Sequence, residues 1–297
     1  MDRTPEQRAR EVFPRRPGEQ DAGAWVRRLD ERDRDELTAF LDADPGFSIF
    51  PRGNLEHYSL NATFVRYWGS FPGGRLSAVL MMVARRAALY APPGAGVHRL
   101  AELAVREGVE FTMGRADLVD EVLAQRGNMP VERREEHHLA MLRDMSAAQP
   151  PVSVPAGAFI RRGTPRDVLA LTQLYLGTDG FENLDEEQVR RTMSNRVRAM
   201  RTYVAVAGAS LVSACSTSAE TPHAAMIGGV WTSPAARNRG YSTAVVAALA
   251  RELIEQGRRP YLFYLTDNAP AARVYAKVGF QPIGRWSVAY LGQHRSR

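Results

Sequence analysis

The stretch Val230-Trp-Thr-Ser-Pro-Ala-Ala-Arg-Asn-Arg-Gly-Tyr-Ser242 indicates how the chain is organised. It begins as a strand, breaks at Ser233-Pro234 and passes through an Arg/Gly turn directly into a helical pattern over 241–256. The first backbone N–H groups of a helix have no partners within it, and the helix dipole adds partial positive charge there. Gly240 has no Cβ and lets a ligand approach the backbone closely. The sequence therefore predicts an anion-binding site at this turn.

The composition fits a globular protein of two domains. The chain has 297 residues, of which 44% are hydrophobic and 24% charged, and domains typically contain about 100–150 residues. The single cysteine, Cys215, excludes an intramolecular disulfide framework and fits a reducing compartment. Residues 1–35 are highly charged, unlike a signal peptide, and no run of about 18 apolar residues occurs. We therefore expect a cytoplasmic protein without a membrane partner.

The net charge of +6 does not by itself predict nucleic-acid binding. The positive charge is almost entirely arginine, and Lys277 is the only lysine. The arginines alternate with acidic residues, as in 27–32, and form no basic stripe with interleaved aromatic residues. We interpret the charge as a solvated mixed-charge surface and expect no nucleic-acid partner.

The first half of the chain has the pattern of an α/β unit. After a lead-in over 1–22, we expect a helix over 24–41, then a turn and a short helix over 47–60. Strands are expected over 63–68, 76–83, 87–90, 109–113 and 135–142, with helices over 97–107 and 116–125. These elements form a predicted domain over 23–145.

The segment 146–157 contains three prolines and no periodicity, so we place a linker and the domain boundary there. In the second domain, 158–297, strands are expected over 158–162, 202–207, 211–218, 224–232, 261–265, 280–286 and 288–291, and helices over 164–176, 185–197, 241–256 and 270–278. Short turns favour antiparallel pairing between 202 and 232. The helix after 232 favours a parallel strand beyond it, by a right-handed crossover.

Two motifs in the second domain resemble those of the GNAT acetyltransferases. Arg237-Asn-Arg-Gly-Tyr-Ser242 resembles the family's Gln/Arg-x-x-Gly-x-Gly/Ala signature, with Ser242 where the family usually has Gly or Ala. Asn268-Ala-Pro-Ala-Ala-Arg-Val-Tyr-Ala-Lys-Val-Gly-Phe280 resembles the family's Asn-x-x-Ala-x-x-x-Tyr-x-x-x-Gly-Phe segment. The order of strands and helices over 158–292 is also similar. Together, in this order, the motifs indicate the family strongly.

By this resemblance the ligand is acetyl-CoA or another acyl-CoA, with no metal. The strand edge would pair with the pantetheine arm, and the backbone of the turn would hold the pyrophosphate. Gly228-Gly229 could form a bulge that separates this strand from the next, or could only relieve crowding. The cofactor-binding residues implied are Val230, Trp231, Thr232, Arg237, Asn238, Arg239, Gly240, Tyr241, Ser242 and Asn268.

Tyr275 is the catalytic candidate. Direct acyl transfer from a thioester expels a thiolate, which a phenol with a pKa of about 10 can protonate, and the family commonly places a tyrosine here. The alternative is core packing on a short helix. Asn268 would contact the CoA arm or the end of the preceding strand, or cap this helix, and these roles can coexist.

No general base is evident. Glu182, Glu220 and His223 are candidates on segments that could border the acceptor site, but each also fits a solvated charge. Cys215 lies in a predicted strand and resembles a buried small hydrophobe, without a partner base. We therefore expect no acyl-cysteine intermediate.

The first domain resembles a second GNAT unit in its order of elements. Its segment 53–58 resembles one in two-part GNAT proteins related to the glycine N-acyltransferase-like branch. At the position of the pyrophosphate loop, 92–97 lacks the Arg/Gln signature, and Pro92 and Pro93 cannot donate N–H groups. The helix over 116–125 has no tyrosine. We interpret this domain as a degenerate copy that could shape the acceptor pocket; a retained weak CoA site is the alternative.

The resemblance implies an α/β (α+β) chain of two GNAT-like units, each a mixed, mainly antiparallel sheet with helices on both faces. The leading hypothesis is an N-acyltransferase that moves an acetyl group from acetyl-CoA to a primary amine, with a small-molecule acceptor favoured. A CoA-binding sensor without turnover and a protein-modifying acetyltransferase are the alternatives, and a homodimer is open. Fold and donor site do not name the amine, so amino acids, polyamines, amine-bearing antibiotics and protein amines all remain.

Overall fold

The computed structural model describes residues 25–145, 154–178 and 180–292. The chain divides into two compact units: unit 1 contains Met1–His137 and Arg285–Arg297, and unit 2 contains His138–Gly284. This division differs from the ranges expected from sequence, because each unit takes in a strand from beyond the expected boundary. The predicted lead-in over 1–22 and most of the predicted linker, 146–153, lie outside the described residues.

Unit 1 is built from the first half of the chain and from its last strand. Its elements, in chain order, are β1 (Trp25–Arg28), η1 (Glu31–Asp33), α2 (Arg34–Asp42), α3 (Ile49–His57), β2 (Val65–Phe71), η2 (Pro72–Gly74), β3 (Ala78–Val83), β4 (Arg86–Tyr90), α4 (His98–Arg106), β5 (Phe111–Arg115), α5 (Ala116–Ala124) and the start of β6 (Val131–Leu142), joined by the end of β12 (Phe280–Leu291). The strands follow the order β1-β2-β3-β4-β5-β12. Of these neighbours only β4 and β5 run parallel.

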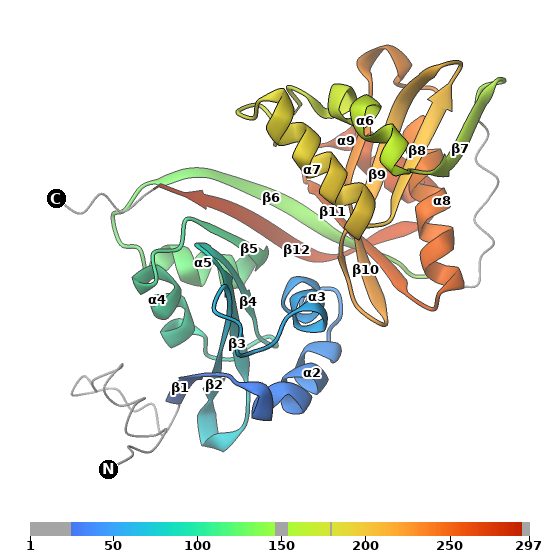
Figure 1. Cartoon of the computed structure of the whole chain (residues 1–297). Coiled ribbons are helices and arrows are strands. Elements are labelled where there is room, and N and C mark those ends of the chain that lie inside the picture. The colour runs from blue at the N-terminus through green and yellow to red at the C-terminus, as the bar shows by residue number, and fades with distance from the viewer. Residues whose placement is uncertain (1–24, 146–153, 179, 293–297) are drawn as a thin grey trace. The chain divides into compact units, whose positions relative to one another are not determined.

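Alternation along β3 explains the layers of unit 1. Leu80 and Met82 pack in a core with α4 and α5, whereas Val79 and Met81 pack in a second core with α2 and α3. Because successive side chains of a strand point to opposite faces, both faces of this sheet are buried under helices. The arrangement is visible in Figure 1, where α2 and α3 lie opposite α4 and α5.

Unit 2 repeats this plan. Its elements are β7 (Ala158–Arg162), η3 (Pro165–Asp167), α6 (Val168–Tyr175), α7 (Glu186–Ala199), β8 (Thr202–Ala207), β9 (Ser210–Glu220), β10 (Ala224–Thr232), η4 (Pro234–Ala236), α8 (Tyr241–Glu255), β11 (Arg259–Leu265), α9 (Ala269–Val278) and the start of β12, joined by the end of β6. The strands follow the order β6-β11-β10-β9-β8-β7. From β7 to β10 neighbours are antiparallel, and β10 and β11 are parallel as expected.

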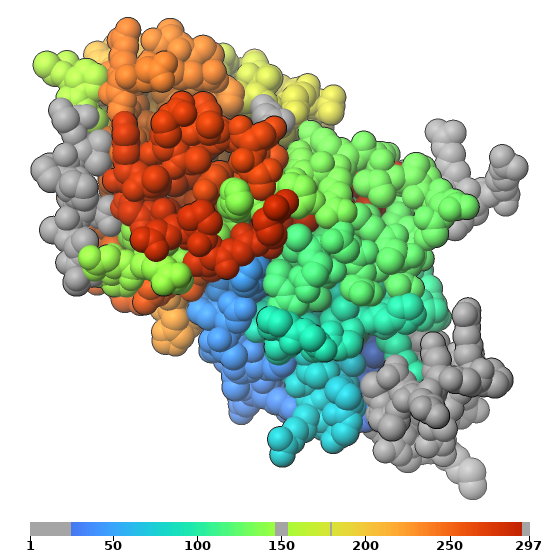
Figure 2. All heavy atoms as spheres, turned by 180° about the vertical axis from the view of Figure 1, so that it is seen from behind, coloured from blue at the N-terminus to red at the C-terminus, as the bar shows by residue number. Residues whose placement is uncertain are grey.

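Helices cover both faces of the sheet in unit 2 as well. On β9, Ala214 packs in a core with α6 and α7, and the next residue, Cys215, packs in a core with α8 and α9. Figure 1 shows α7 and α8 on opposite sides of these strands, and in Figure 2 the last third of the chain, in orange and red, forms most of this unit's visible surface. The predicted fold class is confirmed: the strands of each unit are mixed but mainly antiparallel, and helices cover both faces of each.

Each unit is completed by a strand that follows the elements of the other unit in the sequence. β6 follows α5 of unit 1, yet Ala140 and Leu142 are fully buried in the core of unit 2. β12 follows α9 of unit 2, yet its end pairs antiparallel with β5, from Trp286↔Arg115 to Tyr290↔Phe111. The halves on either side of 146–157 are therefore not self-sufficient sheets.

The predicted helix over 24–41 is wrong. Residues 25–28 form β1, which pairs antiparallel with β2, and the α-helix begins only at Arg34. The Asp30 carboxylate accepts from the Arg32 N–H (2.9 Å), and the Asp33 carboxylate accepts from the Asp30 N–H (2.9 Å). This capping box starts the helical backbone at η1 and ends the strand before it. The strands expected over 280–286 and 288–291 are likewise one continuous strand, β12.

A repeated ion pair at the start of each unit was missed. The stretches Trp25-Val-Arg-Arg-Leu-Asp-Glu-Arg-Asp33 and Phe159-Ile-Arg-Arg-Gly-Thr-Pro-Arg-Asp167 both place an arginine six residues before an aspartate. Arg27 binds Asp33 and Arg161 binds Asp167, each through two guanidinium nitrogens. Comparing the two halves of the sequence would have revealed this duplication.

Within the described residues, no helix is long and apolar enough to cross a membrane.

Candidate functional site

β10 and β11 separate along their length. Their parallel pairing runs from Ala224↔Arg259 to Ile227↔Leu262 and stops there, although both strands continue beyond it. On the other side β10 still pairs with β9, through Trp231↔Ala214 and Thr232↔Ser213. The main chain at the end of β10 therefore has a strand neighbour on one side only. Its other edge is available for a ligand that adds to it like a strand.

Gly228 and Gly229 form a bulge where the strands separate. The register with β9 shifts between Gly228 and Trp231, and Gly229 has a φ of +58°. A Cβ at Gly229 would lie 2.8 Å from Nη1 of Arg196, at the end of a long side chain, so it is mainly the backbone conformation that favours glycine. The Tyr175 hydroxyl donates a hydrogen bond to the Gly229 carbonyl. The glycines thus shape the strand and do more than relieve crowding.

The turn after β10 leads into an open helix N-terminus. Asn238 and Gly240 both have positive φ, +61° and +83°, and α8 begins directly after them. No side chain caps this helix at Gly240, the N-cap residue. The N–H groups of Tyr241 and Ser242 are therefore placed to bind an anion at the positive end of a 15-residue helix.

Arginines flank this turn. Arg237, Asn238 and Arg239 are all exposed. The Arg237 guanidinium lies 5.0 Å from the centre of the Trp231 ring, and its Nε donates to the Thr232 carbonyl at 3.3 Å. The ten residues predicted to bind the cofactor thus lie on the free edge of β10, on the turn and start of α8, and at the start of α9.

Tyr275 lies on α9, on the α8 side of the sheet. It is 8% exposed and packs in the same core cluster as Ile227 and Val230 of β10. Its ring centre is 5.3 Å from that of Tyr264 and 6.4 Å from that of Phe280, and these rings fix its orientation. Burial, followed by the nearby Cys215 and Tyr264, raises the pKa of Tyr275, so the phenol stays protonated at neutral pH.

Asn268 caps α9. Its side-chain oxygen accepts from the Ala271 N–H at 3.0 Å, which satisfies one of the helix's free donors. The side chain is exposed, at the end of β11 where the strands have separated. The capping role is therefore observed, while contact with a CoA arm stays a prediction.

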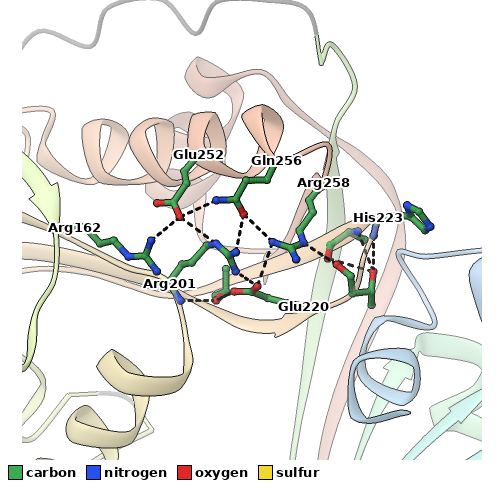
Figure 3. Close-up of polar contacts among 10 residues, drawn as sticks. Arg162, Arg201, Glu220, His223, Glu252, Gln256 and Arg258 are labelled. Carbon is green, nitrogen blue, oxygen red and sulfur yellow. Dashed lines mark hydrogen bonds and ion pairs between the residues drawn. The ribbon is translucent and has the colours of Figure 1, made fainter. Parts of the chain in front are cut away.

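Glu220 and His223 lie at the wrong end of β10 to act as a base. They precede Ala224, and six residues at about 3.3 Å each place them about 20 Å from Val230. Figure 3 shows Glu220 within a network of arginines, and His223 with its ring turned away from that network. The third candidate, Glu182, lies closer to the bulge. It follows Phe181, whose ring contacts that of Tyr175, and Tyr175 in turn donates to the Gly229 carbonyl.

The network in Figure 3 centres on Arg201, which binds Glu220 and Glu252. Arg162 and Arg258 complete it, at 2.9 Å from Glu252 and 3.8 Å from Glu220. The side chains of the central three residues are only 13–18% exposed. Removing Arg201 would leave two partly buried carboxylates without the cation that they share, which is destabilising.

Replacing Arg201 with methionine should lower the free energy of unfolding by about 2–4 kcal/mol, measured by urea denaturation. The matched control is Arg162→Met, because Arg162 is 57% exposed and should contribute less than about 1 kcal/mol. If Arg201→Met unfolds at the same urea concentration as the wild type but loses activity, the ion pair between Arg201 and Glu220 would serve function and not stability.

Cys215 is not placed as a nucleophile. It is fully buried, and its thiol donates to the Val245 carbonyl at 3.3 Å. Burial raises the pKa of this thiol well above its usual range. It therefore remains protonated and packs as a small apolar side chain.

In unit 1 the parallel pairing of β4 and β5 also stops before the strands end, at Ala88↔Met113, but their ends stay close together. A Cβ at Gly114 of β5 would lie 3.3 Å from the Leu89 carbonyl of β4. Arg115 then donates to the Ala91 carbonyl at 2.6 Å and links the ends of the two strands. That unit 1 is a degenerate copy stays a prediction.

Tyr175 and Arg196 were missed by the sequence analysis, although they contact the bulge. They lie on α6 and α7, more than 30 residues before Gly229. Arg196 is one of several arginines on α7, and nothing in its local pattern separates it from Arg190 or Arg198. Only the packing of α7 against β10 distinguishes it.

Comparisons with known proteins agree with this geometry. The FR47-like protein family model matches residues 206–289, a range that contains the β10 edge, the turn and Tyr275. No curated protein gave a significant match. A solved Drosophila protein is similar over 91% of this chain and 99% of its own, with TM-score 0.63 and 15% identity. A GCN5-related N-acetyltransferase from Sphaerobacter thermophilus is similar over 89% and 94%, with TM-score 0.63 and 17% identity.

A tandem GNAT protein from the clavulanic acid biosynthesis pathway is similar over 93% of this chain and 100% of its own, with TM-score 0.58 and 19% identity. The fold is therefore that of the GNAT proteins. Both units take part in this similarity, and most of the range that matches the FR47-like protein model lies in unit 2. Among the described residues, no three or more His, Cys, Asp or Glu side chains are grouped to hold a metal, and the absence of a metal stays an expectation.

Proposed function

We propose that unit 2 binds an acyl-CoA, with acetyl-CoA as the expected donor, and transfers its acyl group to a primary amine. The observation that carries this proposal is the sequence of three features along one stretch: the free edge of β10, the Arg/Gly turn and the uncapped start of α8. A pantetheine arm has amide groups that can pair with a strand edge, and a pyrophosphate suits the helix N-terminus. The same proposal places no second donor site in unit 1.

The transfer is direct. The neutral amine nitrogen attacks the thioester carbonyl carbon, the C–S bond breaks, and the electron pair leaves on the CoA sulfur. Tyr275 donates its phenolic proton to this thiolate, which leaves CoA as the free thiol. The attacking nitrogen loses a proton to water or to Glu182. The products are an amide and CoA, and the phenol regains its proton from solvent.

The proposal is tested by incubating the full chain with acetyl-CoA and a panel of amines while measuring free thiol. Thiol release that depends on an amine supports it. Stabilisation by CoA without release by any amine would instead indicate a sensor, and CoA at 100 times its Kd should stabilise the chain by about 2.7 kcal/mol. Release only with protein amines would favour a protein-modifying enzyme.

Gly240→Ala gives a sharper test of the donor site. At a φ of +83° alanine is strained, and its Cβ stands where the pyrophosphate approaches, so CoA affinity should fall roughly tenfold in calorimetry. Gly94→Ala is the matched control, because Gly94 has a φ of +81° in the corresponding loop of unit 1. An equal loss of affinity in both variants would place a CoA site in unit 1 as well.

A further inference from the structure

We propose that Arg196 forms a carboxylate-binding subsite beside the position of acyl transfer, so that one of the two substrates carries a carboxylate near its reacting group. This inference rests on the proposed function and names its substrate class. The carboxylate can belong to the acceptor amine or to the acyl chain of the donor. The observations below favour the acceptor.

Arg196 lies at the bulge itself. The Cβ position at Gly229 is 2.8 Å from one guanidinium nitrogen, Nη1, and 3.4 Å from Cζ. Cζ is 5.3 Å from the centre of the Tyr175 ring and 5.7 Å from that of Phe181. The guanidinium is therefore fixed between two aromatic rings and the exposed main chain of Gly229, where β10 leaves β11.

The guanidinium has no anionic partner in the part of the chain that the structure describes. Nη1 of Arg196 is buried and has no hydrogen-bond acceptor. Other arginines of unit 2 differ: Arg161 binds Asp167 and Arg201 binds two glutamates. Buried donors without acceptors are rare in proteins and call for an explanation. The planar fork of donors in a guanidinium matches the geometry of a carboxylate, with which it can form two parallel hydrogen bonds.

The fixed cation also selects among amines. A simple alkyl ammonium ion would meet a like charge next to the transfer position, which disfavours its binding. An amine that also carries a carboxylate is neutral overall and offers the anion that Arg196 lacks. The cation then favours loss of the ammonium proton, which attack on the thioester requires. The acceptor is therefore the favoured source of the carboxylate.

The test uses matched substrates and the full chain. In the first arm, acetyl-CoA is combined with each amino acid, its amide and its decarboxylated amine. In the second arm, succinyl-CoA and butyryl-CoA are compared with a single uncharged-chain amine. In one of the two arms we expect kcat/KM to be about 100-fold higher for the substrate with a carboxylate than for its uncharged counterpart. The arm that shows this preference tells whether the acceptor or the acyl donor carries the carboxylate.

Arg196→Gln should remove this preference, and Arg196→Lys should restore part of it. Arg198→Gln on the same helix is the matched control, because Arg198 is exposed, and it should keep the preference. If Arg196 only supports the fold, its variants would lower the melting temperature while the ratio of carboxylate to amide substrate stays unchanged. That outcome, or a wild type without preference in either arm, would overturn the inference.

A binding measurement separates this inference from the proposed function. N-acetyl amino acids and their N-acetyl amides are titrated into the CoA-loaded chain by calorimetry, which requires no turnover. Tighter binding of the carboxylate that depends on Arg196 supports the subsite even if no amine is acetylated. Equal binding of both members of each pair contradicts it, whether or not the chain transfers acyl groups.

Discussion

The Tyr275→Phe variant should lose kcat by roughly 100-fold while its affinity for CoA changes less than twofold. A positioned general acid typically contributes 10²- to 10⁴-fold, and phenylalanine keeps the ring contacts with Tyr264 and Phe280 while it removes the proton. Single-turnover kinetics with acetyl-CoA and calorimetry with CoA measure the two quantities. Equal loss of rate and affinity, or loss of neither, would remove Tyr275 from the mechanism.

Tyr264→Phe is the control for this prediction. Tyr264 contacts the same ring, and burial also raises the pKa of its phenol, yet no proton transfer is assigned to it. It should therefore retain kcat within about threefold, since it removes one hydroxyl and keeps the packing. If Tyr264→Phe reproduces the loss expected for Tyr275→Phe, the effect would come from disturbed packing.

The pH profile follows from the direction of the Tyr275 shift. Because burial raises the pKa of Tyr275 above its usual value of about 10, the phenol stays protonated throughout the range in which the acceptor amine loses its proton. In the wild type, kcat/KM should rise with pH and should not fall through ionisation of Tyr275 below about pH 10. Tyr275→Phe should keep this shape at a lower amplitude.

Residues 158–284 expressed alone should not unfold cooperatively, whereas residues 138–284 should. The shorter fragment lacks the end of β6, so the edge of β11 stays unpaired, and the loss of Ala140 and Leu142 leaves a void in the core cluster that also contains Val245 and Phe280. The free energy of unfolding of a domain is about 5–15 kcal/mol, and loss of a buried strand removes several kcal/mol of it. Thermal unfolding followed by circular dichroism distinguishes the two fragments.

A reconstitution experiment complements this comparison. Fragments 1–145 and 146–297 together contain every strand of both units, so their co-expression should yield a folded pair that purifies as one species. Neither fragment should do so alone, because each lacks a strand that completes its main sheet. Cooperative unfolding of 158–284 at the temperature of 138–284 would show that β6 is dispensable.

Most elements could be predicted because their signals are local. On α8, Val245, Leu249 and Leu253 recur at helical spacing, and all three are fully buried. The exchange of β6 and β12 could not be predicted, because a strand's own residues do not state which neighbour it pairs with. The prediction of a helix over 24–41 was wrong because the spacing of Trp25 and Leu29 also fits a strand followed by a turn.

The candidate site divides in the same way. The turn from Arg237 to Gly240 could be predicted because a helix N-terminus and its preceding loop are contiguous in sequence. The contact between Arg196 and Gly229 could not, because it depends on the packing of α7 against β10. Glu220 could have been excluded as a base from the sequence. It precedes the strand 224–232, and the Arg/Gly turn follows the opposite end of that strand.

The position of β12 has a consequence for synthesis of the chain. β5 pairs with residues 286–290, so its edge can be paired only after unit 2, which lies between them in the sequence, has been made. Domains usually fold in order as they leave the ribosome, N-terminal first. Here most of unit 1 is made before unit 2 but waits for a strand made after it, with the β5 edge unpaired in the interval and open to pairing with other chains. Truncation before residue 286 would therefore remove the partner of β5 and damage the unit that is made before unit 2.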